Sequence, residues 1–371
     1  MASAVLENQL RMFARKNKQS QQALVVGLDI GSQQIKAVAV ARGEQGPVLQ
    51  EYVVAATPST LGKKGAEATF AAELLQVLGA LPRLKAVDRR VYVSVSCPSA
   101  TIAVVEVPRM EVVEAREVLK LNSTRYLRRD LTNSYLDVSE LVDSAADPKA
   151  RKSATMRLLA AAASKEEIQW FRTMLTAAKL RPASIELSAM TVVNAFQISH
   201  REICEKGAAL VVDIGARMTS MNFLRGGQPV LTRIMEFGGD RITDSIAQSL
   251  GLEPKAAEEE KRKLSEFMQP LVQGGLAPLA REIRASVDFF ERQHDCHVGH
   301  AVVGGGTAAS AVIVGLLSEA TAVPFEIWNP VQGYSTAGLA GAAERLPAVA
   351  SSLAAAVGLA APRVILQEPP T

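Results

Sequence analysis

Two stretches of the chain, about 180 residues apart, share one pattern of apolar and polar positions. In each, an unbroken apolar run ends in Asp-Ile-Gly and is followed by a second strand-like run. The first stretch spans residues 24–40 with Asp-Ile-Gly at 29–31, and the second spans 208–224 with Asp-Ile-Gly at 213–215. Continuous apolar runs bounded by turn residues are typical of buried strands. The pattern therefore predicts one hairpin that occurs twice.

The rest of the first half alternates between strand and helix patterns. Apolar periodicity predicts strands at 47–55, 90–96, 101–107, 134–142, 155–163 and 183–187, and helices at 67–81, 112–127, 165–180 and 190–204. Residues 101–163 read as strand, helix, strand, strand, which makes a compact unit that looks inserted into a larger fold.

The second half repeats this plan. The predicted strands are 228–236 and 301–303, and the predicted helices are 241–250, 258–267, 276–294 and 308–317. Asp240 stands where it would cap the first of these helices. A glycine triplet at 304–306 ends the last strand, and we expect a helix to open directly after it. Alternating strands and helices in two matching halves indicate a duplicated α/β fold.

Composition limits the class of protein. A chain of 371 residues that is 48% hydrophobic is long enough for two or more domains. A net charge of +3 gives no general attraction to nucleic acid. The three cysteines are widely spaced and odd in number, which fits a reducing compartment. No apolar run reaches the roughly 18–20 residues that cross a bilayer, so we expect a cytoplasmic protein.

Residues 1–22 form a separate N-terminal segment. Its apolar positions have helical spacing and are followed by a basic cluster, which is the wrong order for a signal peptide. A helix that binds a membrane surface or a partner is one interpretation; a frayed terminal helix is the other.

The turns at the two hairpins suit a phosphate chain. Glycine lets backbone N–H groups approach a phosphate closely, and Gly31 and Gly215 supply this freedom. Ser32 and Thr219 are candidates for additional hydroxyl donors. A single Asp-Ile-Gly turn more often only closes a hairpin. Two copies in matched contexts favour a ligand held from both sides.

Charged residues of the same hairpins extend the hypothesis. Asp29 and Asp213 stand at strand ends, where carboxylates order the water shell of a Mg²⁺ ion that bridges phosphates. Lys36 is placed to reach a phosphate as a point charge.

The glycine triplet is a second kind of candidate site. Bare backbone at Gly304, Gly305 and Gly306 lets a flat base or ribose approach, and Thr307 follows at the expected helix start. Helix N-termini favour anionic groups. Alone this signal is weak, because tight strand-to-helix turns that bind nothing look similar.

The order of these three segments resembles the phosphate 1, phosphate 2 and adenosine motifs of the superfamily of actin, heat-shock ATPases and sugar kinases. Within it, the likeness is strongest to the PilM family of type IV pilus assembly proteins and to the related FtsA family, over about residues 12 to 360. The segments that carry the likeness are 13–16 before 26–32, 105–110, 126–127, 159–165, 177–182, 237–240, 251–252, 257–261, 303–306 and 355–359.

The resemblance implies a duplicated actin-like ATPase fold, of the ribonuclease H-like kind, with an inserted α+β subdomain. The implied divisions are an extension (1–22), subdomain 1A (23–99 and 165–189), the inserted subdomain 1C (100–164), subdomain 2A (190–240 and 298–345), subdomain 2B (241–297) and a C-terminal helix and tail (346–371).

It also implies the cofactors ATP and Mg²⁺ and further site residues. Gly238 and Gly239 would form a turn beside the nucleotide, Glu258 would accept from ribose hydroxyls, and Lys261 would lie along the base. Arg217 and Met218 replace residues that are usually smaller in the family, so they either crowd the terminal phosphate or, through Arg217, neutralise it. No acid stands out as a base that activates water, and we expect weak or no ATPase activity.

The implied function is that of a cytoplasmic adaptor at the inner face of the inner membrane. A PilN-like membrane protein would place its short cytoplasmic tail in a groove between subdomains 1A and 1C, near residues 91–96 and 112–127. Membrane association would be indirect or through residues 1–22. The resemblance leaves open whether the protein forms a homo-oligomer. The alternatives are an FtsA-like filament-forming membrane adaptor and a small-molecule kinase of the same superfamily.

Two other groups of residues, three histidines and the two tryptophans, stand outside the matched hairpins. His294, His297 and His300, with a cysteine between them, have spacing that permits zinc binding, yet they stand where a long helix should end, and histidines are favoured there without a metal. Trp170 and Trp328 lie in apolar contexts and are expected in the core.

Overall fold

Two five-stranded sheets with the same strand order form the frame of the protein. The computed structural model describes residues 24–85, 87–141, 153–339 and 341–365. The first sheet has the order β3-β2-β1-β4-β8 and the second the order β11-β10-β9-β12-β13. In each sheet the first strand in sequence pairs antiparallel with the second and parallel with the fourth. The predicted duplication is confirmed.

The strands of the first sheet are β1 (Val25–Ile30), β2 (Gln34–Gly43), β3 (Gly46–Ala56), β4 (Arg90–Val95) and β8 (Arg181–Leu187), and those of the second are β9 (Ala208–Ile214), β10 (Thr219–Arg225), β11 (Gln228–Met235), β12 (His300–Gly304) and β13 (Phe325–Ile327). The helices are α2 (Glu67–Leu78), α3 (Val112–Leu121), α4 (Ser123–Leu127), α5 (Lys165–Ala177), α6 (Ser188–Ser199), α7 (Arg201–Lys206), α8 (Gly239–Leu250), α9 (Pro254–Lys263), α10 (Gln269–His294), α11 (Ala311–Thr321), α12 (Leu346–Val349) and α13 (Ala354–Ile365).

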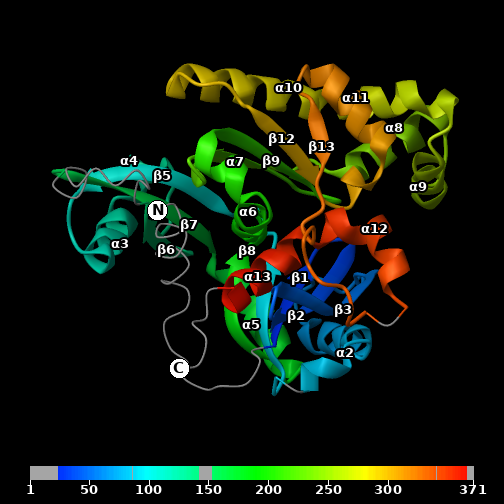
Figure 1. Cartoon of the computed structure of the whole chain (residues 1–371), viewed down its shortest axis with the longest axis horizontal. Coiled ribbons are helices and arrows are strands. Elements are labelled where there is room, and N and C mark those ends of the chain that lie inside the picture. The colour runs from blue at the N-terminus through cyan, green and yellow to red at the C-terminus, as the bar shows by residue number, and fades with distance from the viewer. Residues whose placement is uncertain (1–23, 86, 142–152, 340, 366–371) are drawn as a thin grey trace.

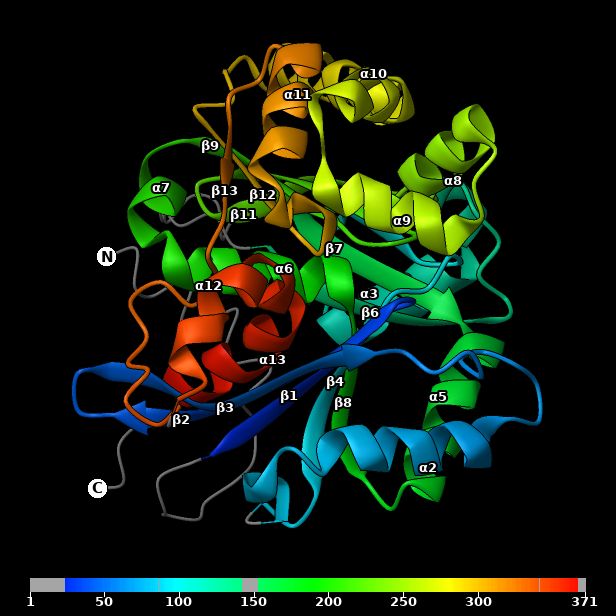
Figure 2. The ribbon, with the colours of Figure 1, turned by 90° about the vertical axis from the view of Figure 1, so that its right-hand side faces the viewer.

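Helices cover both sheets and also separate them. Apolar residues of α2 and α5 share a buried cluster with the outer face of the first sheet, and residues of α8, α10 and α11 do the same for the second sheet. Helices α6 and α13 lie in the middle, between the two sheets (Figures 1 and 2). Strands buried on both faces carry the continuous apolar runs that made the hairpins visible in the sequence.

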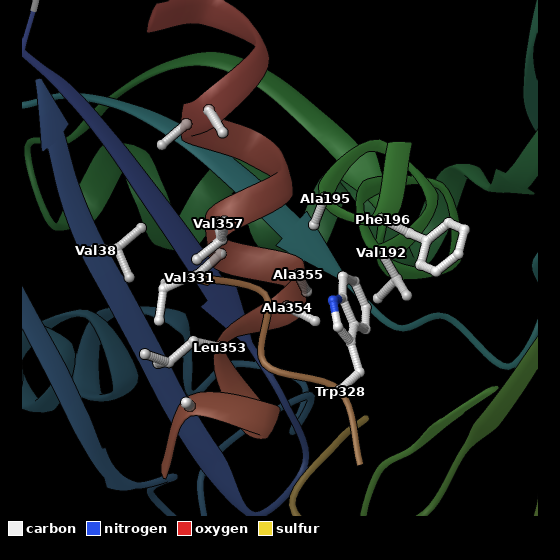
Figure 3. Close-up of a cluster of buried hydrophobic side chains, with 14 of the residues drawn as sticks. Val38, Val192, Ala195, Phe196, Trp328, Val331, Leu353, Ala354, Ala355 and Val357 are labelled. Atoms are coloured by element: carbon white, nitrogen blue, oxygen red, sulfur yellow. The ribbon is translucent and has the colours of Figure 1, made fainter. Parts of the chain in front are cut away.

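The central layer holds the two halves together. Its cluster joins Val38 of the first sheet, Phe196 of α6, Trp328 and the alanine-rich helix α13 (Figure 3). Trp328 is 2% exposed, so its predicted place in the core is confirmed. The approach of α13 to α6 is close enough that a Cβ at Gly358 would lie 1.7 Å from the carbonyl oxygen of Thr191.

The inserted unit forms a sheet of its own. Strands β5 (Thr101–Pro108), β7 (Thr155–Ser164) and β6 (Ser134–Glu140) pair in that order, and α3 and α4 pack on one face. The predicted single helix over 112–127 is wrong, because the backbone leaves the helical region at Asn122. The predicted helix over 190–204 is likewise split, at His200. Strand β5 also packs against β11 of the second sheet.

One helical segment has the length and composition of a membrane span but lies in the core. The continuous helical segment Ala343–Ile365 is long and apolar enough to cross a membrane by length and composition. However, 78% of its most apolar window is buried inside the protein. It ends in α13, the central core helix, and core helices pass the same test as membrane spans.

Candidate functional site

A cavity of about 1280 Å³ lies where the two hairpin turns face each other. It is lined by both Asp-Ile-Gly turns, by the glycine turn after β12, and by residues of α8 and α9. The sequence-predicted residues on its wall are Asp29, Gly31, Ser32, Lys36, Asp213, Gly215, Gly239, Glu258, Lys261, Gly305, Gly306 and Thr307. Twelve side chains or glycines from opposite halves of the chain thus share one space.

The first turn is held by an ion pair. Asp29, at the end of β1, is 5% exposed and lies directly across from Lys36 on β2. The Lys36 ammonium is 3.1 Å from a carboxylate oxygen of Asp29. The Gly31 N–H closes the turn by donating to the Gln34 carbonyl at 3.1 Å. This leaves Ser32 and Gln33 at the tip of the turn.

The second turn has the same backbone but different charges. Its Gly215 N–H donates to the Met218 carbonyl at 3.0 Å, as in the first turn. Asp213, however, pairs across the hairpin with Ser220, where the first hairpin has Lys36. The pKa of Asp213 is raised to about 6, chiefly by burial; the charge of Lys36 opposes the rise and that of Asp29 adds to it. The two carboxylates therefore interact with each other across the cavity.

Three predicted residues do not line the cavity. Thr219 is fully buried and its hydroxyl donates to the Phe237 carbonyl at 2.7 Å, so the expectation that it offers a donor to a ligand is wrong. Gly238 packs against the backbone of Ala216, and Gly304 faces Ser351 and Trp328. Both glycines allow close packing behind the site.

The glycine turn after β12 contributes two residues and a hydroxyl. Gly305 has φ +93°, and a Cβ there would lie 2.4 Å from the Ile214 carbonyl oxygen, so only glycine fits. The Thr307 hydroxyl donates to the Gly215 carbonyl at 3.2 Å. The predicted helix does not open directly after the glycines: a 3₁₀ turn (Thr307–Ala309) intervenes, and α11 begins after Ser310, whose side chain caps it.

Helix α9 presents a closed group of polar residues. Glu258 accepts from the Thr243 hydroxyl at 2.6 Å and lies 2.5 Å from the Lys261 ammonium. Lys261, whose side chain is 8% exposed, also donates to the Gly239 carbonyl at 3.0 Å. Arg262 holds the other oxygen of Glu258 at 3.0 Å. Hydrogen bonds to Lys261 and Thr243 lower the pKa of Glu258 although burial opposes them as the largest single effect.

Sequence reasoning missed a contact between the halves at the mouth of the cavity. The Gln33 amide donates to Asp240 at 2.9 Å, and Arg217 lies 3.6 Å from the other oxygen of Asp240. Asp240 was expected to cap a helix, and that is wrong: α8 begins at Gly239, with Gly238 as its N-cap residue. The only signal in the sequence was the position of Gln33 and Arg217 at the tips of matched turns.

One end of the cavity extends beyond the two turns, toward the junction with the inserted sheet. Ser96 and Pro98 of this junction line it, together with Glu166, Glu167 and Trp170 of α5. Trp170, expected in the core, is partly buried against the core cluster of the first sheet, with its ring edge-on to Phe70 and Phe171, and it also lines the cavity. Its indole N–H donates to the Lys63 carbonyl at 3.0 Å. We call this part the α5 wing.

The donor set suits magnesium better than zinc. Asp29 and Asp213 face one cavity, and their mutual repulsion is the kind that a bound divalent cation relieves. Within the described residues, no group of three or more His, Cys, Asp and Glu could hold a metal. A pair of carboxylates matches Mg²⁺, which keeps several of its waters.

The histidine group forms no metal site within the described residues. The His297 side chain is 93% exposed and lies 3.3 Å from Glu291. His294 ends α10 with its ring against Phe290. The zinc interpretation is therefore not supported.

Comparison with known proteins assigns this architecture. A family model described as type IV pilus assembly protein PilM matches residues 27–364. The chain belongs to the PilM family. The structure of a PilM-PilN type IV pilus biogenesis complex is similar at 26% identity and a TM-score of 0.80, covering 93% of this chain and 99% of that one. The ethanolamine utilization protein EutJ from Carboxydothermus hydrogenoformans shares the fold, at 13% identity and a TM-score of 0.50, covering 98% of this chain and 99% of that one.

Membership of the PilM family agrees with the two sheets of matching strand order described above. The chain is an actin-like type IV pilus assembly protein with an actin-like ATPase fold. The match favours this hypothesis over the FtsA-like and small-molecule kinase alternatives.

Proposed function

We propose that the chain is an ATP-binding adaptor of a type IV pilus assembly platform, and that it binds the short cytoplasmic tail of a PilN-like inner-membrane protein. The observation that carries the proposal is the single cavity shared by both Asp-Ile-Gly turns and the glycine turn after β12. It would place the protein at the cytoplasmic face of the inner membrane.

The residues of the cavity divide the work of binding by their chemistry. Ser32 and the amides at the tips of the two turns face a phosphate chain, and Asp29 and Asp213 hold the waters of Mg²⁺. Gly305 and Gly306 form a bare shelf for the nucleoside, and the Glu258–Lys261 pair closes over it from α9. Bound Mg·ATP supplies negative charge and a link between the halves, which favours the closed arrangement of the two sheets.

The α5 wing is our proposed place for the partner tail. It is lined by α5, by residues before and at the start of α2, and by Ser96 and Pro98, and it belongs to the same cavity as the nucleotide end. Trp170 and its neighbour Phe171 offer apolar contacts, and three glutamates, Glu67, Glu166 and Glu167, outnumber the one lysine of this part of the wall, Lys64. A tail with an apolar anchor and a basic residue fits this chemistry. Helices α3 and α4, near which the sequence placed the tail, contribute no residue to the wall of the cavity.

Calorimetric titration of the full chain tests the proposal. Wild-type protein should bind Mg·ATP saturably, and a synthetic PilN-like tail more tightly with nucleotide present. Gly306→Val should block nucleotide binding, because a Cβ there meets only the Gln34 side chain, at 3.6 Å, and projects into the cavity without backbone clash. Gly315→Ala, in open space on α11, is the matched control and should change neither titration.

Two outcomes would overturn parts of the proposal. Nucleotide binding that Gly306→Val leaves intact would remove the cavity as the site. Tail binding that is the same with and without nucleotide would remove the coupling. A charge change in the wing, Glu166→Lys, should weaken tail binding and leave ATP affinity unchanged. We expect slow or no release of phosphate from ATP in the same samples.

A further inference from the structure

A hydrogen bond crosses the mouth of the cavity and joins the two halves of the protein. Gln33, at the tip of the first turn, donates to Asp240, in the first turn of α8, at 2.9 Å. The two residues are 207 positions apart in the sequence, and both line the cavity. The contact stands at the exposed end of the space, beside the tips of both hairpin turns.

Arg217 makes a weak additional contact with Asp240. It occupies the tip of the second turn, and 72% of its side chain is exposed. Its Nε lies 3.6 Å from the Asp240 oxygen that Gln33 does not use. That separation is longer than a hydrogen bond, and exposed ion pairs of this kind contribute little to stability. Arg217 is thus charged, close to the site and weakly held.

The other cations on the part of the wall that the second half contributes have firmer partners. Lys261 is held by Glu258, by Thr243 and by the Gly239 carbonyl at 2.5–3.0 Å. Arg262 is 3.0 Å from Glu258. In the first half, Lys36 is 3.1 Å from Asp29. Among these residues, Arg217 can change partner at the smallest cost.

We propose that Arg217 recognises the terminal phosphate of a nucleoside triphosphate, and that Asp240 and Gln33 hold its place when that phosphate is absent. The inference rests on the proposed function, because it assumes a nucleotide between the two turns. A guanidinium forms short, paired hydrogen bonds with phosphate, which are stronger than its present contact. The same phosphate would repel the Asp240 carboxylate, so Arg217 would leave Asp240.

This arrangement makes the site selective for triphosphate over diphosphate. A diphosphate would end before the tip of the second turn and leave the Arg217–Asp240 pair in place. Arg217 would then contribute nothing to its affinity. The contacts of Arg217 at the mouth of the cavity would then differ between the ATP-bound and ADP-bound proteins that the partner tail meets. The two halves would stay joined with either nucleotide.

Titration of the full-length protein with Mg·ATP and with Mg·ADP tests the proposal. Arg217→Ala should weaken ATP binding about tenfold, the worth of a charge-assisted hydrogen bond, and change ADP binding less than about twofold. Arg217→Lys keeps the charge but not the paired geometry and should recover part of the loss. Asp240→Asn should tighten ATP about threefold, because it removes a repelling charge and frees Arg217.

Arg241→Ala is the matched control. Arg241 is an exposed arginine next to Asp240 that does not line the cavity. Its loss therefore removes the same charge without changing the contact between Gln33, Asp240 and Arg217. The ratio of ATP to ADP affinity should stay as in wild type. Thermal unfolding of each variant checks that the fold is kept.

The outcomes separate this inference from the proposed function. If wild type binds both nucleotides, and Arg217→Ala and Asp240→Asn both keep the wild-type ratio of ATP to ADP affinity, the proposed role of Arg217 is wrong. The nucleotide site itself then stands. If wild type binds neither nucleotide, the proposed function and the role of Arg217 are both wrong.

Discussion

The two Asp-Ile-Gly hairpins have matching backbones and opposite electrostatics. In the first, Lys36 stands across from Asp29 and neutralises it at 3.1 Å. In the second, Ser220 occupies the corresponding position across from Asp213, whose pKa is raised to about 6. Duplication therefore preserved the turn, which the close approach of two strands requires, while the charge beside it diverged. The first hairpin carries its own counter-charge, whereas in the second a bound cation would supply one.

The largest expected effect comes from removing the shared lysine. Lys36→Ala leaves Asp29 buried without its partner and withdraws the charge that lowers the pKa of Asp213. We expect a loss of about 3 kcal/mol in the free energy of unfolding, typical for one partner of a buried pair. Urea unfolding measures it. Lys263→Ala, at an exposed ion pair on α9, is the control and should unfold as wild type does. An equally small change in Lys36→Ala would show that the first hairpin is not held by this pair.

Neutralising each aspartate should have effects of opposite sign. Because the folded-state pKa of Asp213 lies above its ordinary value, ionisation above pH about 6 disfavours the folded state. Asp213→Asn should therefore stabilise the ligand-free protein at pH 8 by about 1–2 kcal/mol and have no effect below pH about 4, where the unfolded carboxyl is protonated as well. Asp29→Asn should destabilise by about 1 kcal/mol, because it leaves Lys36 without its counterion.

Thermal unfolding of both variants between pH 4 and pH 8, without magnesium, provides the measurement. The same sign for the two substitutions at pH 8 would contradict the electrostatic difference between the hairpins. Addition of Mg²⁺ and ATP should raise the unfolding temperature of wild type more than that of Asp213→Asn.

The smallest expected effect concerns the turns themselves. A Cβ at Gly31 would lie 2.8 Å from the Gln34 carbonyl oxygen and 3.2 Å from the Lys36 ammonium, whereas one at Gly215 would meet only the Met218 carbonyl, at 3.0 Å. Gly31→Ala should therefore cost more stability than Gly215→Ala, by about 1 kcal/mol. Chemical denaturation of the two variants decides it, and the reverse order would mean that the second turn is the more tightly packed.

Much of the architecture was predictable because it depends on short-range pattern. The apolar runs before Asp29 and Asp213 marked buried strands, and their repetition indicated the duplicated sheets. The same patterns missed the breaks at Asn122 and His200, since periodicity continues across a short break while the backbone does not. The burial of Thr219 was also missed, because the turn sequence shows which residue types are present but not which way each side chain points.

By itself, the sequence determined that the chain has two matched halves, a glycine in each turn and a unit inserted within the first half, because these follow from local spacing and backbone freedom. Only the tertiary structure decided which residues meet. Gln33 and Asp240 lie 207 positions apart, and Trp170 lines the cavity because α5 passes beside the inserted sheet. The charge of Asp213 likewise depends on burial and on Lys36 in the other half, which is a property of the assembled fold and not of its own segment.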